Sequence, residues 1–343
     1  MTNKTFRAAR FAAQLALVAL TLGTLFGVAA RAAADEIKIG IIMEARPAEQ
    51  PWSAAIYDAA QALAKKNPSL KFLQSYKAYD PTSAEPVARQ MLQEGAVILD
   101  MHSFALNDVA HALAKEFPKI PMSVSSFDPP VQPNLNIGTV SYLQVGYSNC
   151  WLLAKLSKSG KIAFAGALPI PYATEALKGC ELGAAAANSG TKVLAGYGNS
   201  FSNPQTTREV AQGLLDQGAD VLFPASATED SLGGFQLCEQ KHIPCAGWVS
   251  DVRRYAPNYG VVSAIANWTI FLEGLIAQHT SGKLEANTFD ASFGNGGLTP
   301  QPFEGEPGKL VPADVQKGYA DVIKALTEGK IELPKSQAHP CCT

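Results

Sequence analysis

The sequence has little charge and almost no excess of either sign. Asp, Glu, Lys and Arg make up 17% of the chain, and the formal net charge is -2. A basic field that would attract nucleic acid or an anionic membrane surface is therefore missing, and we expect no nucleic-acid partner. The 47% of hydrophobic residues excludes a disordered chain, because disordered chains bury too little apolar surface to fold.

The chain also lacks the short motifs of common hydrolases and nucleotide-binding enzymes. It has no GxSxG, no HExxH and no P-loop. Gly179 and Gly183 fall in a predicted helix, so they do not form a phosphate-binding turn. The five His residues are scattered and no two Cys residues have CxxC spacing. We therefore expect no metal, no cofactor and no catalytic site.

The first 34 residues have the pattern of a secretory signal peptide. A basic start precedes an apolar stretch over residues 11–30, and Ala-rich cleavage sites follow. We predict cleavage after Ala34, and a retained transmembrane anchor is the alternative. The first cysteine is Cys150, so no lipid-anchor cysteine follows the apolar stretch. The mature protein is expected in the periplasm.

An oxidising compartment would allow the cysteines to form disulfides. Cys150 and Cys180 lie in two predicted helices and would pair if those helices touch. Cys238 and Cys245 have a spacing that would close a small loop. Buried free thiols are the alternative for all four. The sequence assigns no role to Cys341 and Cys342.

The mature chain alternates between predicted strands and helices. Short apolar runs predict strands, and amphipathic segments between them predict helices. Strands are predicted over residues 37–43, 70–76, 96–101, 120–125, 136–141, 161–166, 192–197, 220–224 and 243–248. Helices are predicted over residues 54–66, 81–93, 106–116, 143–156, 173–187, 204–216, 230–241 and 314–328. A Gly- and Pro-rich extended loop is predicted over residues 294–312.

Two successive runs of this kind predict an α/β protein with two doubly wound parallel sheets. At 343 residues the chain is long enough for two domains. We assign residues 35–141 plus 263–290 to an N-terminal lobe. Residues 142–262 plus 291–333 form a C-terminal lobe, and residues 334–343 form a loose tail.

Aromatic residues recur where predicted strands end. Ligands of open parallel sheets bind outside the carboxyl ends of the strands. Rings gathered there suit a planar ligand held between them. The four aromatic strand-exit residues are Trp52, Phe104, Phe201 and Trp248. Other residues that follow strands include Glu44, Phe127, Tyr172 and Thr228.

Several segments, taken in order, point to a known family. They are residues 37–43 with Trp52, 95–98 with Ser103 and Phe104, 114–118, 161–163, 168–171, 199–201 with Pro204, 216–221, 250–251, 255–257 and 267–268. Over roughly residues 37–283 this ordered set resembles the basic membrane protein (BMP) family of ABC-transporter substrate-binding proteins.

The resemblance implies a bilobal type I periplasmic-binding-protein fold with three crossovers between the lobes. It implies a small-molecule ligand of the purine or nucleoside type and, as partner, an ABC-transporter permease in the inner membrane. In the family's pattern, Trp52 and Phe201 would sandwich the ring. Asp108 matches a carboxylate that holds ribose hydroxyls, and Asp251 matches the second acid of an Asp-x-Asp loop.

The chain departs from the family's pattern at its polar positions. Val249 stands where the first acid of that loop is expected, and Ala266 replaces a Lys. Ala225, Ser226 and Ala227 replace a His-Thr-Asp segment. The groups that would recognise a sugar are thus fewer, which favours a purine base or another flat heterocycle over a nucleoside.

The predicted function is binding by a monomer, without chemistry. The alternatives are a sensor domain that feeds a membrane receptor and a secreted nucleoside hydrolase. For single residues, Trp52 could instead pack the first helix, Asn267 could cap a helix, and Asp251 could pair with a neighbouring Arg. The predicted ligand-binding residues are Gln50, Trp52, Ser103, Phe104, Asp108, Pro169, Phe201, Ser226, Trp248, Asp251 and Asn267.

Overall fold

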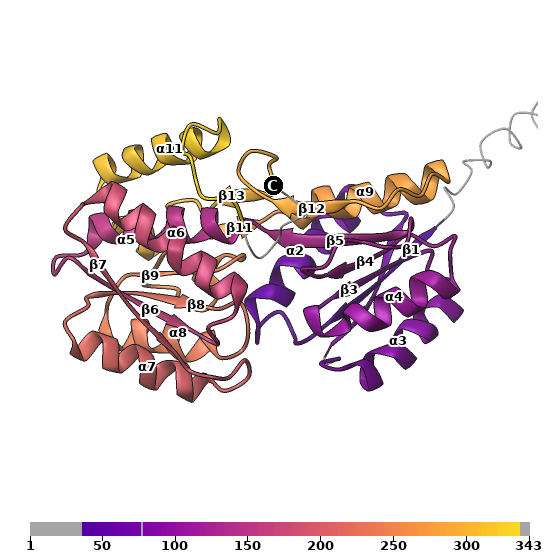
Figure 1. Ribbon diagram of the computed structural model, residues 1–343, viewed down its shortest axis with the longest axis horizontal. Helices are drawn as coiled ribbons and strands as arrows, with labels where there is room; N and C mark the ends of the chain where they lie inside the picture. Colours follow the sequence, from indigo (N-terminus) through magenta and orange to yellow (C-terminus); the bar gives the residue numbers. More distant parts are fainter. Residues whose placement is uncertain (1–35, 77, 337–343) are drawn as a thin grey trace, which may run out of the picture. The chain divides into compact units, whose positions relative to one another are not determined.

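The computed structural model describes residues 36–76 and 78–336. The predicted signal peptide, most of the predicted tail, and Cys341 and Cys342 lie outside these residues. Two parallel sheets with helices on both faces dominate the described part (Figure 1). The predicted α/β fold class is therefore confirmed.

The first sheet has six strands, all paired in parallel. Side chains alternate between its faces: Ile41 of β1 packs with Ile56 of α2, whereas Ile42 packs with the helices opposite. Helices α2 (Pro51–Lys66) and α9 (Trp268–Ser281) cover one face, and α3 (Pro81–Gln93) and α4 (Asn107–Glu116) cover the other. The strand order is β12 (Thr288–Ala291), β5 (Leu135–Val140), β4 (Met122–Ser125), β3 (Ile98–His102), β1 (Ile37–Met43) and β2 (Leu70–Ser75).

The second sheet has five strands and the same alternation. Phe164 of β6 faces α5 and α6, whereas Ala163 and Ala165 face α7 and α8. The strand order is β10 (Gly260–Val262), β9 (Cys245–Ala246), β8 (Val221–Ala225), β6 (Lys161–Gly166) and β7 (Lys192–Tyr197). The helices are α5 (Tyr142–Leu156), α6 (Pro171–Ala187), α7 (Pro204–Asp216), α8 (Ser231–Lys241) and α11 (Ala313–Thr327). We call each sheet with its covering helices a lobe.

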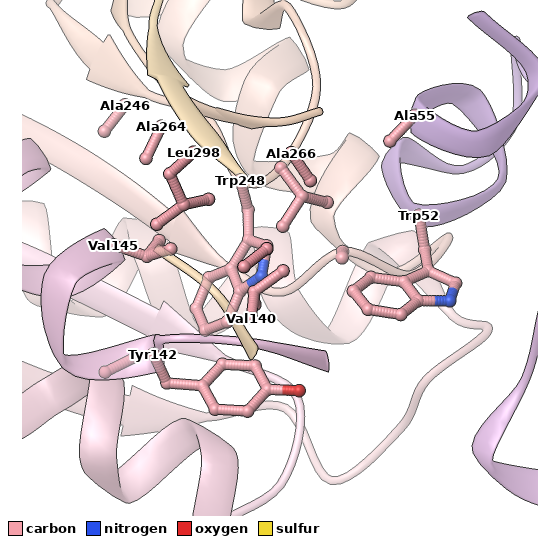
Figure 2. Packing of buried hydrophobic residues seen from close by; sticks show 14 of the residues in the cluster. Trp52, Ala55, Val140, Tyr142, Val145, Ala246, Trp248, Ala264, Ala266 and Leu298 are labelled. Carbon is pink, nitrogen blue, oxygen red and sulfur yellow. The ribbon is translucent and has the colours of Figure 1, made fainter. Parts of the chain in front are cut away.

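The chain passes between the lobes three times. It leaves the first lobe after β5, returns between β10 and α9, and leaves again after β12. A short antiparallel pair, β11 (Ala264–Ala266) with β13 (Leu298–Pro300), lies along these passages. One apolar core runs through the crossing, and Figure 2 shows Val140, Trp248, Ala264 and Leu298 within it.

Three local predictions were wrong. Only Cys245–Ala246 of the strand predicted over residues 243–248 forms, and Pro244 before it has no N–H to donate. The predicted loop over residues 294–312 contains β13 and α10 (Gly305–Lys309), because β13 finds a partner strand far away in the sequence. Helix α2 begins at Pro51, since proline favours a first helical position.

One of the two suggested disulfides is present. The sulfur atoms of Cys150 and Cys180 are bonded, and they join α5 to α6. The suggested Cys238–Cys245 disulfide was wrong, because both residues are buried free thiols. Burial raises the pKa of the Cys238 thiol, and the nearby Cys245 thiol raises it further. Both thiols thus act as small apolar side chains in the core between the second sheet and helices α7 and α8.

Helices α5 and α6 approach so closely that glycine is required between them. A Cβ atom at Gly183 would lie 2.1 Å from the carbonyl oxygen of Tyr147, and one at Gly179 would lie 2.2 Å from that of Leu143. No side chain fits such distances, so these glycines allow the backbones to touch.

We expect Gly183→Ala to destabilise the protein by about 1–3 kcal/mol or more, because the methyl group forces the two helices apart. Gly213→Ala in α7 is the matched control: nothing lies within 4 Å of its Cβ position. There the change should stabilise by about 0.5–1 kcal/mol through helix propensity. Urea unfolding of both variants measures the difference. Equal stabilities would contradict the close approach.

Candidate functional site

A cavity of about 320 Å³ lies where the carboxyl ends of both sheets meet. Most of its wall is formed by aromatic side chains from both lobes. The lining residues are Glu44, Trp52, Tyr79, Phe104, Ala105, Phe127, Tyr142, Ile170, Tyr172, Phe201, Ala227, Thr228 and Trp248. Eight of them are aromatic, which is typical of a site for an apolar or planar ligand.

Trp52 anchors the first-lobe wall. It lies in the first turn of α2, only 4% exposed, and its indole stacks on His102 with ring centroids 4.9 Å apart. Phe104 follows β3 and stacks on Phe127 at 4.6 Å. The backbone N–H of Trp52 also donates to the carbonyl of Ala227 in the second lobe, at 2.9 Å. Packing thus fixes the indole, and a backbone hydrogen bond ties its residue to the other lobe.

Trp248 anchors the second-lobe wall. It follows β9, is 1% exposed and meets Tyr172 edge to face at 6.0 Å. Figure 2 shows Tyr142, the first residue of α5, beside this indole, with ring centroids 6.0 Å apart. Phe201 is different, because it is 40% exposed although it lines the cavity. Its ring is therefore less fixed by packing than the two indoles.

Glu44 supplies the one carboxylate of the cavity wall. It follows β1 directly, and two buried side chains hold it. The Ser103 hydroxyl donates to Oε1 at 2.6 Å, and the Gln50 amide donates to Oε2 at 2.7 Å. Both oxygens retain further acceptor capacity, since a carboxylate oxygen accepts more than one hydrogen bond. The group is therefore oriented before any ligand binds.

A second carboxylate, Asp230, is buried behind the second-lobe wall. It accepts from the hydroxyls of Ser226 at 2.8 Å, Thr228 at 2.6 Å and Thr207 at 2.9 Å. Burial raises the pKa of Asp230 to about 6, although these hydroxyl bonds lower it. Thr228 itself lines the cavity, so Asp230 fixes part of the wall.

Tyr79 and Glu229 join the two lobes beside the cavity. The Tyr79 phenol, which lines the cavity, donates to Glu229 Oε1 at 2.7 Å. Burial, this bond, and the charges of Glu229, Glu49 and Glu44 raise the pKa of Tyr79 to about 12. The phenol therefore remains protonated and keeps donating at neutral pH.

Four of the eleven predicted ligand-binding residues line the cavity: Trp52, Phe104, Phe201 and Trp248. Three more hydrogen-bond to the wall or to the groups behind it. Gln50 and Ser103 bond to Glu44, and Ser226 bonds to Asp230 and shares a hydrogen bond with Thr228. All seven stay predictions as ligand contacts.

The other four predicted residues do not line this cavity. Asp108 is exposed in the first turn of α4, and Pro169 is exposed while its neighbour Ile170 faces the cavity. Asp251 accepts from the Arg253 guanidinium at 2.6 Å, which was the alternative interpretation. Asn267 is the N-cap residue of α9, and its side chain donates to the carbonyl of Gly296.

Several lining residues are absent from the eleven predicted ligand-binding residues. Glu44, Phe127, Tyr172 and Thr228 follow predicted strands, and that signal was available. Tyr79 and Tyr142 also come after predicted strands, over residues 70–76 and 136–141, and the same signal applied to them.

Within residues 36–76 and 78–336, no group of three His, Cys, Asp or Glu residues has the geometry to hold a metal ion. None of the helices described there is long and apolar enough to cross a membrane.

Comparison with known proteins gives consistent results. The family model for PnrA-like ABC transporter substrate-binding proteins matches residues 36–299. A purine-binding protein of Brucella abortus (strain 2308) is 24% identical over 256 residues, which is 74% of this chain and 71% of that protein. A putative ABC transporter glucose-binding protein of Haloferax volcanii is 22% identical over 286 residues, covering 82% and 70%.

Solved structures agree on the fold. A solute-binding protein of an ABC transporter system from Conexibacter woesei superposes with a TM-score of 0.74 at 24% identity. The match covers 87% of this chain and 98% of that one. The predicted bilobal periplasmic-binding fold and the family resemblance are both confirmed.

The buried Asp230 carboxyl predicts a pH effect on stability. Its pKa is raised in the folded state, from 3.8 to about 6, so the folded protein holds this proton more tightly than the unfolded chain. The resulting stabilisation is present below pH 4 and is lost as the pH rises through about 6, by about 2–3 kcal/mol.

Asp230→Asn should reduce this loss, since an amide does not ionise and the Thr207 hydroxyl can turn to accept from it. Urea midpoints of both proteins between about pH 4 and pH 7 measure the effect. Asp290, whose pKa burial also raises to about 6, is unchanged in the variant and provides the comparison. Parallel pH profiles would contradict the role given to Asp230.

Proposed function

The chain belongs to the family of PnrA-like ABC transporter substrate-binding proteins, and we propose that it captures a flat heterocyclic solute in the aromatic cavity. It would then deliver the solute to the permease of an ABC importer in the inner membrane. We place this binding in the periplasm, by a monomer, without chemical conversion of the ligand.

The aromatic wall carries this proposal. Eight rings from both lobes surround about 320 Å³, a volume at the small end of the range for ligand pockets. Aromatic faces hold planar rings by stacking and by excluding water. A purine base is one solute of this size and shape, and the purine-binding relative from Brucella abortus supports that choice.

A sugar is the rival ligand, because another relative is named as a putative glucose-binding protein. Sugar hydroxyls need several hydrogen-bond partners, and each one left unpaired in a closed site lowers affinity. The polar side chains that line this cavity are Glu44, Tyr79, Tyr142, Tyr172 and Thr228. Tyr79 and Thr228 already donate to carboxylates of the protein, which favours a ligand with few hydroxyls.

We expect the two lobes to close over the ligand, and the polar contacts between them support this. Besides the Tyr79–Glu229 bond, the Tyr255 hydroxyl of the second lobe donates to the carbonyl of Pro47 at 2.8 Å. Arg254 pairs with Asp58 of α2 at 2.8 Å. Each of these bonds joins one lobe to the other, between residues at least 150 positions apart in the chain. They would therefore break when the lobes open about the three crossings.

Calorimetry and native mass spectrometry against purine bases, nucleosides, sugars and amino acids test the proposal. We expect a flat heterocycle to bind and sugars to bind weakly or not at all. A sugar as the tightest ligand, or no binding by folded protein, would overturn it. The sensor and hydrolase alternatives are tested by uptake in a strain that lacks the gene and by product analysis with bound nucleosides.

Phe201→Ala should weaken binding of the flat ligand about 2- to 10-fold, because one aromatic face is worth about 0.5–1.5 kcal/mol. Phe201 is 40% exposed, so its removal should leave the unfolding midpoint nearly unchanged. Val131→Ala, at a position that is 72% exposed and outside the cavity wall, is the matched control. Calorimetry measures both. An affinity equal to that of the control would exclude Phe201 from the site.

Tyr79→Phe removes only the hydroxyl that bonds Glu229, so the ring stays in the wall. We expect faster ligand release, by about fivefold, because one bond of the closed form to a charged acceptor is lost. Tyr76→Phe is the matched control, since Tyr76 bonds Gln74 within the same lobe. Stopped-flow release rates compare the two. Equal rates would show that the Tyr79–Glu229 bond does not stabilise closure.

A further inference from the structure

The charged side chain of the cavity wall is negative, and no positive one lines the wall beside it. Among its thirteen lining residues Glu44 is the one ionisable carboxyl group, and no Lys, Arg or His is present. The eight aromatic rings of the wall add to the negative charge of Glu44, because the face of an aromatic ring carries partial negative charge. Among these lining residues, no cationic side chain balances the Glu44 carboxylate.

Further carboxylates lie close behind the wall. The charges of Glu229, Glu49 and Glu44 all act on the Tyr79 phenol, and those of Asp230 and Glu44 act on the Tyr172 phenol. Within the described residues, no salt bridge joins Glu44, Glu229 or Asp230 to a cationic side chain. Carboxylates of both lobes therefore act on rings of the cavity wall.

A neutral ligand would leave this charge uncompensated. When a ligand fills the cavity and the lobes close, water leaves the Glu44 carboxylate. Burying a carboxylate without a counter-charge is costly, and the two hydrogen bonds from Ser103 and Gln50 offset only part of that cost. A ligand that brings its own positive charge removes the penalty and gains cation–π attraction from the rings.

We infer that the solute is a positively charged flat nitrogen heterocycle, whose ring lies between the aromatic faces and whose cationic nitrogen lies near Glu44. The charge comes either from a protonated ring or from a quaternary ring nitrogen. This inference rests on the proposed function, because it specifies the ligand of the same cavity. The inferred solute differs from a neutral purine base in charge but is similar to it in shape and size.

Isosteric pairs of compounds provide the test. Nicotinamide and quinoline are neutral near neutral pH, and methylation of the ring nitrogen makes each a permanent cation of nearly the same shape. Adenine serves as the neutral purine. We expect each cation to bind at least about tenfold tighter than its neutral partner in calorimetry at low salt. The unaltered protein gives this ratio without any substitution.

Two variants assign the preference to Glu44. Glu44→Gln should lower the affinity for the cations about tenfold or more and leave the neutral partners nearly unchanged. Glu44→Asp keeps the charge and should retain most of the preference. Glu209→Gln, an exposed carboxyl on α7, is the control for net charge. Unfolding midpoints identify any variant that fails to fold.

The outcomes separate this inference from the proposed function. If adenine or the neutral compound of a pair binds as tightly as the cations, the inference is overturned. The proposed function then still stands. Binding by no flat compound overturns both. A cation preference that persists in Glu44→Gln overturns the role of Glu44. Binding of acyclic quaternary ammonium compounds in preference to flat cations contradicts the requirement for a ring.

Discussion

Parallel pairing within both sheets is the constraint on which the site depends. Parallel strands connected through helices all end at the same edge, so the loops after β1, β3, β6, β8 and β9 collect at two facing edges. The aromatic residues that follow these strands converge although they are far apart in the sequence. Trp52 and Trp248 are separated by almost two hundred residues, yet they line one cavity. An antiparallel arrangement would have sent alternate strand ends to opposite sides.

The crossing between the lobes combines an apolar core with polar bonds. The apolar core is continuous from α2 and α9 through Val140, Trp248 and Ala264 into the second sheet. Three side-chain bonds between the lobes lie apart from this core, whereas the backbone bond from Trp52 to Ala227 joins two of its members. Polar contacts of this kind exchange readily with water, whereas the core does not. In the proposed opening, the polar bonds would therefore break while the shared core stays packed.

The sequence predicted part of the site and missed the rest for identifiable reasons. The strand-exit pattern predicted Trp52, Phe104, Phe201 and Trp248 as ligand-binding residues, and these four line the cavity. It also selected Asp251, which does not line the cavity and whose carboxylate pairs with Arg253. It could not rank Glu44 above other polar residues, since the two side chains that orient it come from different loops. For Tyr79, the sequence could not show the partner in the opposite lobe, because Glu229 lies 150 residues away.

The sequence by itself determined the α/β class, the two successive runs of strands and helices, and the presence of rings at strand exits. These follow from apolar periodicity and from local turn chemistry, which act over a few residues. Only the tertiary structure decided which disulfide formed, that residues 298–300 join a sheet, and that one carboxylate faces eight rings. Those outcomes depend on contacts between residues far apart in the chain, and periodicity carries no information about such contacts.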